Sequence, residues 1–309
     1  MAGDLGRRLA VAGVGIPLGI LLIYLGGWAL GVTVAVVAAL GTREFYVLAE
    51  KRGANGVGGA DSVPPAPASR PFRGLGIVAA VTLVLAVAHD PVWPRLAGVG
   101  WTVVVSLLIV SLGAAVFRRG PKGTPLASTS ATVAGALYAG GTLVFALLIR
   151  HLPEAVGASG AGSEPWHGAA LLIFPLTAAW FGDSAAYFAG SRWGRRKLFP
   201  AASPKKSVEG AVAGLLGSVL VGGLFGALVL GSLPVFSVSP LSGAVIGLLV
   251  GLVAQVGDLA ESVLKRDAGV KDSGTLLPGH GGVLDRFDGI LVTLPLAYML
   301  IVLNRWLGF

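Results

Sequence analysis

The sequence contains no cysteine, and it has few histidines and few charged residues. Without cysteine the chain has no disulfide, zinc thiolate site, iron–sulfur cluster or cysteine nucleophile. The four histidines, at positions 89, 151, 167 and 280, show neither HxxxH nor HExxH spacing, so a histidine-based metal centre is not expected. Asp, Glu, Lys and Arg together make up only 12% of the chain, against 54% apolar residues. This balance argues against an ordinary soluble domain.

The apolar residues are gathered into blocks of roughly 17 to 25 residues, the length that a helix needs to cross a bilayer. The mean hydropathy of the chain is +0.81. The first block follows Arg7 and Arg8 and leads directly into further apolar blocks, so we interpret it as a retained helix and not as a signal peptide. The sequence predicts an all-α polytopic membrane protein with about nine transmembrane helices, at residues 9–26, 28–48, 74–90, 98–117, 130–150, 168–190, 211–231, 240–260 and 284–306.

The basic residues predict the orientation of these helices. With a cytoplasmic N-terminus, 20 of the 23 Lys and Arg residues lie in cytoplasmic segments, and only Arg95, Arg150 and Arg305 lie outside. The positive-inside rule favours this topology, here in the cell (inner or plasma) membrane. Loops 191–210 and 261–283 then face the cytoplasm, and an active site there would too. The net charge of +8 does not indicate a nucleic-acid partner, because the basic residues are divided among short loops.

The distribution of charge divides the chain into two regions. Residues 1–150 hold about five spans and a Gly-, Pro- and Ala-rich loop at 51–73 that is expected to be flexible. Residues 151–309 hold the later spans and both charged loops, and they are predicted to form the catalytic region. The 48 glycines, mostly inside the spans, are expected to let helices pack closely and not to cradle phosphate.

The end of the eighth span carries a stripe of polar residues. Asp258, Glu261 or Ser262, and Lys265 are spaced i, i+3 or i+4, and i+7, so they share one face of a helix. A carboxylate as deep in an apolar run as Asp258 is costly unless it is used, which favours a functional role. Lys265 and Arg266 could instead reach the membrane interface from a helix end.

The ninth span begins with Asp285 and Asp288, spaced i, i+3. Each of them alone could simply bond the free N–H groups of a helix start. Together with Asp258 and Glu261 across the loop, they form a carboxylate cluster with no sulfur or imidazole. Hard oxygen ligands of this kind favour Mg²⁺, which also binds substrate phosphates.

The loop between these two spans contains a glycine-rich turn, PGHGG, at 278–282. Its glycines permit close approach of the backbone to a ligand. Taken alone, His280 could be a surface histidine, and Lys271 with Asp272 an ordinary solvated pair. The combined density of cations, carboxylates and glycine in one short segment beside the membrane is the informative feature.

A second polar cluster comes earlier in the chain. Asp183 lies near the end of the sixth span, and Lys205, Lys206 and Glu209 follow in a basic loop. By itself this loop could serve only topology or attraction to anionic lipid. However, a polyphosphate site needs cations for its oxygens and carboxylates for its metal, and both are predicted on one side of the membrane. The residues therefore indicate a membrane-embedded, Mg²⁺-dependent enzyme that acts on a polyphosphate and a lipid.

The residues from Ser262 to Asp288 carry a recognisable pattern, S-x2-KR-x4-KD-x-G-x2-LPGHGG-x2-DR-x-D. It resembles the signature of the phosphatidate cytidylyltransferases (CDP-diacylglycerol synthases) of the bacterial type. DSAAY at 183–187 and SPKKSVEG at 203–210 are similar to the second motif of that family, with Ser184 where the family usually has Thr. The resemblance implies an all-helical membrane homodimer that transfers the cytidylyl group of CTP to phosphatidic acid, giving CDP-diacylglycerol and pyrophosphate.

The resemblance also implies roles for individual residues. Asp258, Asp285 and Asp288 are expected to hold Mg²⁺, while Asp183 and Glu261 are expected to be further ligands or to support them. The cations are expected to bind the triphosphate and the lipid phosphate, and the PGHGG turn to shape the loop around the nucleotide. The predicted catalytic residues are Asp258, Lys265, Arg266, Lys271, Asp272, His280, Asp285, Arg286 and Asp288, and the predicted substrate-binding residues are Asp183, Lys205, Lys206, Glu209, Glu261, Ser262, Gly281 and Gly282.

Three other functions remain open from the sequence. A CTP-dependent polyprenol or lipid kinase would use the same nucleotide but transfer the γ-phosphate, and its product would distinguish it. A CDP-alcohol phosphotransferase is disfavoured because its DGxxAR…GxxxDxxxD pattern is absent. A transporter would place charges near mid-membrane in paired broken helices, whereas here the charges gather at the ends of late helices.

Overall fold

A computed structural model shows a helical bundle over the residues that it describes, which are 2–54, 70–118, 120, 124–157, 164–274 and 281–307. Side chains are described within these ranges except at 2–12, 52–54 and 93–96. The helices are α1 (Ala2–Leu25), α2 (Gly27–Ala54), α3 (Arg73–His89), α4 (Trp93–Arg118), α5 (Pro125–Gly135), α6 (Thr142–Arg150), α7 (Leu152–Ala155), α8 (Pro165–Trp193), α9 (Val208–Leu228), α10 (Pro240–Asp267) and α11 (Leu284–Leu307), with a π-helix, η2 (Ala136–Gly141), and a 3₁₀ turn, η4 (Leu230–Ser232).

The nine predicted spans all fall on helical segments, which confirms a polytopic all-α fold. In lipid the backbone must satisfy its own hydrogen bonds, and a helix does this within one segment. Among the described residues, seven stretches are long and apolar enough to cross a membrane, and two shorter apolar helices cover Gly13–Leu25 and Arg73–His89. The seven are Gly27–Lys51, Ala97–Arg118, Pro125–Arg150, Pro165–Trp193, Val208–Ser232, Pro240–Asp267 and Leu284–Leu307.

Three predicted loops have different boundaries in the structure. The loop expected at 191–210 contains an antiparallel hairpin of β1 (Lys197–Phe199) and β2 (Ser203–Ser207), in which Lys197 pairs with Ser207. The loop expected at 261–283 begins only after Asp267, because α10 continues to that residue. Of the loop expected at 51–73, residues 51–54 continue α2 and residues 55–69 lie outside the described part of the chain.

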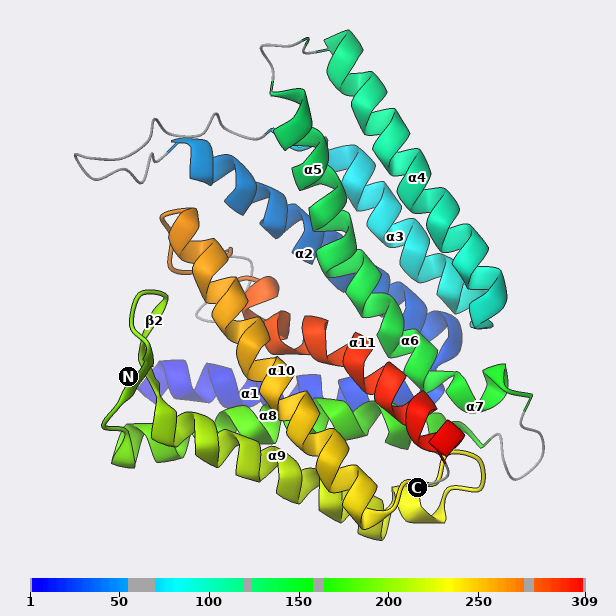
Figure 1. The fold of residues 1–309 in the computed structure, drawn as a ribbon, viewed down its shortest axis with the longest axis vertical. Coiled ribbons are helices and arrows are strands. Elements are labelled where there is room, and N and C mark those ends of the chain that lie inside the picture. The colour runs from blue at the N-terminus through cyan, green and yellow to red at the C-terminus, as the bar shows by residue number, and fades with distance from the viewer. Residues whose placement is uncertain are drawn as a thin grey trace.

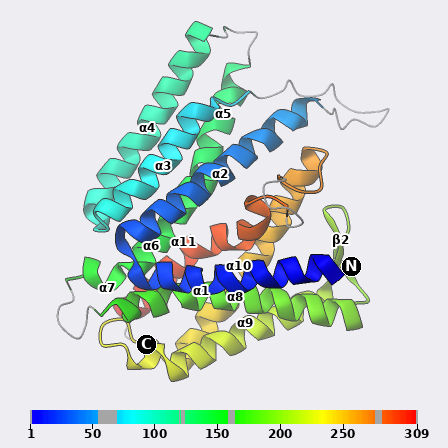
Figure 2. The ribbon, with the colours of Figure 1, turned by 180° about the vertical axis from the view of Figure 1, so that it is seen from behind.

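The helices form two groups joined by α10 and α11 (Figure 1). Helices α1, α8 and α9 run side by side at one end of the molecule, and α2 to α5 gather at the other (Figure 2). Helix α9 packs closely on α10 because small residues face each other. A Cβ at Gly222 would lie 2.0 Å from the carbonyl oxygen of Gly243, and one at Gly247 would lie 2.3 Å from that of Ser218. The prediction that glycines allow close helix packing is thus confirmed at this interface.

One hydrophobic core extends through both predicted regions of the chain. Leu147 of α6, Leu171 and Phe174 of α8, and Leu291 and Leu294 of α11 are all buried within it. The core therefore holds the last two long helices against the helices that precede the hairpin. This packing brings the last turns of α8, the hairpin, the start of α9, the second half of α10 and the start of α11 together, and their polar residues meet there.

Candidate active site

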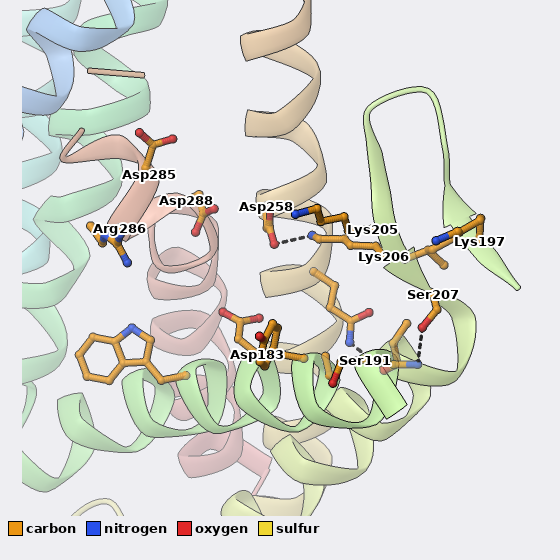
Figure 3. A pocket seen from close by; sticks show the side chains of 18 residues that line it. Asp183, Ser191, Lys197, Lys205, Lys206, Ser207, Asp258, Asp285, Arg286 and Asp288 are labelled. Carbon is orange, nitrogen blue, oxygen red and sulfur yellow. Dashed lines mark hydrogen bonds and ion pairs between the residues drawn. The ribbon is translucent and has the colours of Figure 1, made fainter. Parts of the chain in front are cut away.

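A cavity of about 740 Å³ lies where α8, the β-hairpin, α9, α10 and the first turn of α11 come together. Seven of the predicted site residues line it, and Figure 3 shows their side chains. The aspartates among them come from three different helices, and the cations come from the hairpin and from α11. The seven residues are Asp183, Lys205, Lys206, Asp258, Asp285, Arg286 and Asp288.

Three carboxylates converge in this cavity. Asp183 of α8, Asp258 of α10 and Asp288 of α11 lie near one another in Figure 3 and interact electrostatically. Asp258 forms an ion pair with Lys206 of β2, and both side chains are about a quarter exposed, at 29% and 26%. Like charges gathered in a partly enclosed site repel one another, so this arrangement favours a bound cation or a cationic side chain.

The carboxylates of this cavity could form part of a Mg²⁺ site that is completed by water and substrate. Over the described part of the chain, no three His, Asp or Glu side chains form a group that could hold a metal ion. Mg²⁺ commonly takes only one or two protein carboxylates and completes its shell with water and substrate phosphates. Asp258 and Asp288, with Asp183 beside them, could supply such a partial set.

Asp285 has a different environment from the other three aspartates. Its Oδ1 accepts a hydrogen bond from Nζ of Lys265 at 2.7 Å. Its Oδ2 accepts hydrogen bonds from the backbone N–H of Ser273 at 2.9 Å, from the Ser273 hydroxyl at 2.9 Å and from the backbone N–H of Gly282 at 2.8 Å. Both oxygens are therefore engaged by protein donors, and Asp285 ties the two ends of the 273–282 loop to α11. Its predicted metal ligation stays a prediction.

Lys265 is held between two carboxylates. Besides Asp285 it bonds Oε2 of Glu261 at 2.8 Å, and the side chain of Glu261 is fully buried. The other oxygen of Glu261, Oε1, and the Tyr138 hydroxyl on η2 are buried without a hydrogen-bond partner in the described structure. Glu261 lies on the same helix as Lys265, so the bond from Lys265 to Asp285 is the one that links α10 to α11. Burying charged groups is costly unless their geometry is fixed, which favours one arrangement of these three side chains.

The β-hairpin carries the lysines of the site. Ser207 caps α9 by accepting a hydrogen bond from the N–H of Gly210 at 3.2 Å. Glu209 accepts the backbone N–H groups of Arg195 at 3.0 Å and of Arg196 at 3.2 Å, so it fastens the entry to the hairpin onto α9. The Lys205 side chain forms no hydrogen bond or ion pair with another described residue, and it lines the cavity. It is therefore available to an anionic ligand.

Several predicted residues do not line the cavity. Arg266 donates to the carbonyl of Ala202 at 3.3 Å and to that of Val270 at 3.1 Å, which braces the hairpin turn. Lys271 and Asp272 are exposed. Gly281 has φ +78°, a conformation that favours glycine. The predicted residues outside the lining are Glu209, Glu261, Ser262, Lys265, Arg266, Lys271, Asp272, Gly281 and Gly282, and His280 lies outside the described residues.

The structure adds cavity residues that the sequence analysis did not select. Lys197 of β1, Gln255 of α10, and Trp180 and Tyr187 of α8 line the wall, and Gln255 donates to the carbonyl of Ala211 at 2.9 Å. An amide inside an apolar span is a signal that could have identified Gln255. The aromatic residues gave no such signal, because lipid-facing aromatic side chains have the same pattern.

The fold and the cavity together define a class of protein. It is a polytopic helical membrane protein whose polar cavity places Lys and Arg beside several aspartates, which is the donor set required for binding a phosphorylated substrate with a metal.

Comparison with known proteins identifies the family. The model of the Cytidylyltransferase family matches residues 6–304. The chain is 35% identical over 315 residues to the phosphatidate cytidylyltransferase of Synechocystis sp., and the match covers 96% of each protein. It is 35% identical over 224 residues to the phosphatidate cytidylyltransferase of Brucella suis, covering 70% of this chain and 76% of that one. It is 30% identical over 314 residues to the chloroplastic phosphatidate cytidylyltransferase 4 of Arabidopsis thaliana, covering 97% and 74%. The chain belongs to the Cytidylyltransferase family.

Proposed function

We propose that this protein transfers the cytidylyl group of CTP to phosphatidic acid, giving CDP-diacylglycerol and pyrophosphate. The observation that carries the proposal is the composition of one cavity in a family member. Lys205, Lys206 and Arg286 line it together with Asp183, Asp258 and Asp288, so it offers both charges that a metal-bound triphosphate needs.

The position of the cavity suits a reaction between a soluble nucleotide and a lipid. Part of its wall is the basic hairpin, with Lys197 and Lys205. Another part is Trp180 and Tyr187 of the span α8, which are 53% and 70% exposed. Aromatic side chains of this kind favour the membrane interface, where a lipid phosphate would lie.

The chemistry requires little covalent participation by the protein. A phosphate oxygen of phosphatidic acid attacks the α-phosphorus of CTP, one P–O bond forms, and the bond to the bridging oxygen of the leaving pyrophosphate breaks. The attacking phosphate is already an anion, so no strong general base is needed. The main obstacle is repulsion between anions, which Lys205, Lys206 and Arg286 reduce by neutralising phosphate charge.

The aspartates have a complementary task. Asp258 and Asp288, with Asp183 next to them, would hold Mg²⁺, and the ion would stabilise negative charge on the phosphate oxygens. Lys206, which is paired with Asp258, would bind a substrate phosphate in the same cavity. Asp285 would join this set only by releasing one of its present donors. The remaining proposals are a cytoplasmic site, an inner or plasma membrane location and a homodimer, which follow from the basic loops and from the family.

A product assay tests the proposal. Purified protein in mixed micelles receives CTP, phosphatidic acid and Mg²⁺, and pyrophosphate and lipid product are followed together. We expect equal amounts of CDP-diacylglycerol and pyrophosphate. The Asp258→Asn variant should lose about 10²-fold or more in kcat, while Asp90→Asn, at the end of α3 and outside the cavity, serves as the matched control.

Other products would contradict the proposal. Release of CDP together with a newly phosphorylated lipid would identify a CTP-dependent lipid kinase, because the γ-phosphate would then be the group transferred. An Asp258→Asn variant with wild-type turnover would show that the Asp258 carboxylate is not needed for the reaction.

A further inference from the structure

Glu44 is a buried carboxylate in the apolar helix α2, far from the cavity in the sequence. It is only 5% exposed, and it does not line the cavity. A carboxylate in such a position is costly unless several donors surround it. The hydrogen-bond partners of Glu44 therefore indicate its structural role.

Among the described residues, its partners lie on the loop before α11 and on the first residue of that helix. Oε1 of Glu44 accepts the backbone N–H of Val283 at 3.0 Å. Oε2 accepts the backbone N–H of Leu284 at 2.9 Å and lies 3.0 Å from the hydroxyl of Ser273, whose single proton it shares with Asp285. The N–H groups at the start of a helix have no partner within the helix, and they attract negative charge. Glu44 thus caps α11 from a different helix.

Steric contacts around Glu44 support the same conclusion. A Cβ at Gly274 would lie 2.5 Å from Oε1 of Glu44, and one at Gly282 would lie 2.4 Å from Oε2. A side chain at either position would therefore have to push the Glu44 carboxylate away from its present place. The loop closes tightly around Glu44.

A chain of hydrogen bonds connects this contact with the site. The Ser273 hydroxyl lies 3.0 Å from Glu44 and 2.9 Å from Oδ2 of Asp285, and Asp285 in turn bonds Lys265. The same first turn of α11 carries Arg286 and Asp288 into the cavity (Figure 3). A change in the angle of this turn would move both side chains.

We propose that Glu44 is a positioning residue for the transfer reaction. It fixes the first turn of α11 against α2, and it thereby places Arg286 and Asp288 at the reacting phosphates without touching substrate. This inference rests on the proposed function for its effect on turnover, whereas the contact itself can be tested without any activity.

The Glu44→Gln variant tests the proposal because it keeps the shape of the side chain but removes the charge and one acceptor. Glu50→Gln is the matched control, since Glu50 lies on the same helix and pairs with Arg73 at the surface. We measure kcat, the KM values for CTP and for phosphatidic acid, and the unfolding temperature. Hydrogen exchange of peptides that cover residues 283 and 284 gives the readout that is independent of activity.

We expect Glu44→Gln to lower kcat by about tenfold to 10²-fold, because small misplacements at a reacting centre have effects of this size. The KM for CTP should change less than kcat, since Lys205 and Lys206 belong to the hairpin. Exchange at residues 283 and 284 should be faster, and Glu50→Gln should match the wild type in both measurements.

A kcat of the folded Glu44→Gln protein within twofold of the wild type would overturn the proposal, even if its unfolding temperature fell. If this variant does not accumulate, Glu44→Asp replaces it, because it keeps the charge but withdraws the carboxylate from the N–H groups of Val283 and Leu284. A loss of about threefold or more in kcat of the folded protein then supports the proposal, and wild-type kcat overturns it. Wild-type protein that forms no CDP-diacylglycerol would instead defeat the proposed function, and hydrogen exchange would still test the contact.

Discussion

Lys205 and Lys206 are neighbours on β2, and the same substitution at each should separate substrate binding from stability. Both side chains line the cavity, but among the described residues only the Lys206 side chain has an ion-pair partner, Asp258. Replacing either lysine with glutamine removes one positive charge from the phosphate site. Only the Lys206→Gln change leaves a partly buried carboxylate unpaired.

The magnitude follows from the burial of the pair. Fully exposed ion pairs contribute about 0–1 kcal/mol, and loss of one partner from a fully buried pair costs about 3–5 kcal/mol. With side chains 26% and 29% exposed, Lys206 and Asp258 lie between these limits. We therefore expect Lys206→Gln to cost about 1–3 kcal/mol of unfolding free energy, and Lys205→Gln to stay within about 0.5 kcal/mol.

The effect on catalysis should be similar at both positions. A hydrogen bond to a charged group contributes about 1.5–3 kcal/mol, so loss of one phosphate contact should lower kcat/KM for CTP by about 10- to 100-fold. The assay is steady-state formation of CDP-diacylglycerol, together with thermal unfolding in the same detergent. Equal unfolding temperatures for the two variants, or wild-type kcat/KM in both, would refute the reasoning.

Three further predictions follow from other parts of the structure. Arg150 is buried and donates to two carbonyls at the end of α1, at 2.6 and 2.7 Å. Thermal unfolding of Arg150→Met should therefore show a loss of about 2–4 kcal/mol of unfolding free energy, and the product assay should show an unchanged kcat of the folded protein. Gly222→Leu should force α9 away from α10, because even a Cβ there would lie 2.0 Å from a carbonyl oxygen, and size-exclusion chromatography should show loss of monodisperse protein. The control variant Gly19→Ala, with no atom within 4 Å of its Cβ, should be tolerated. Removal of divalent metal with EDTA should abolish turnover and added Mg²⁺ should restore it, and activity that survives complete chelation would exclude the metal role of Asp258 and Asp288.

The positions of Asp285 and Glu261 show where local pattern stopped being informative. Helical spacing placed Asp258, Glu261 and Lys265 on one stripe, but in the structure only Asp258 lines the cavity, while Lys265 joins Glu261 to Asp285. Spacing along a helix specifies a shared face, and it does not specify which neighbour each side chain meets. The packing of α11 on α10 determines that Lys265 meets Asp285.

Glu44 shows the same limit over a greater distance. Two of its hydrogen-bond partners, Val283 and Leu284 at the start of α11, are 239 and 240 residues away in the chain. Glu44 and Asp258 are both carboxylates within an apolar run. Only Asp258 is followed by a dense charged motif, so only Asp258 was predicted as a site residue. The hairpin at 197–207 was similarly read as loop, because its short polar strands have no apolar alternation.

The sequence by itself determined that this protein is a helical membrane protein, since long apolar runs can satisfy their backbone only as helices in lipid. It also determined the reaction family and most of the charged residues in the cavity, because these form a dense local pattern between two spans. Only the tertiary structure decided which carboxylates converge, which are neutralised by lysine or backbone donors, and which helix holds the first turn of α11. Those outcomes depend on contacts between segments that are distant in the chain, and no local pattern of residues encodes them.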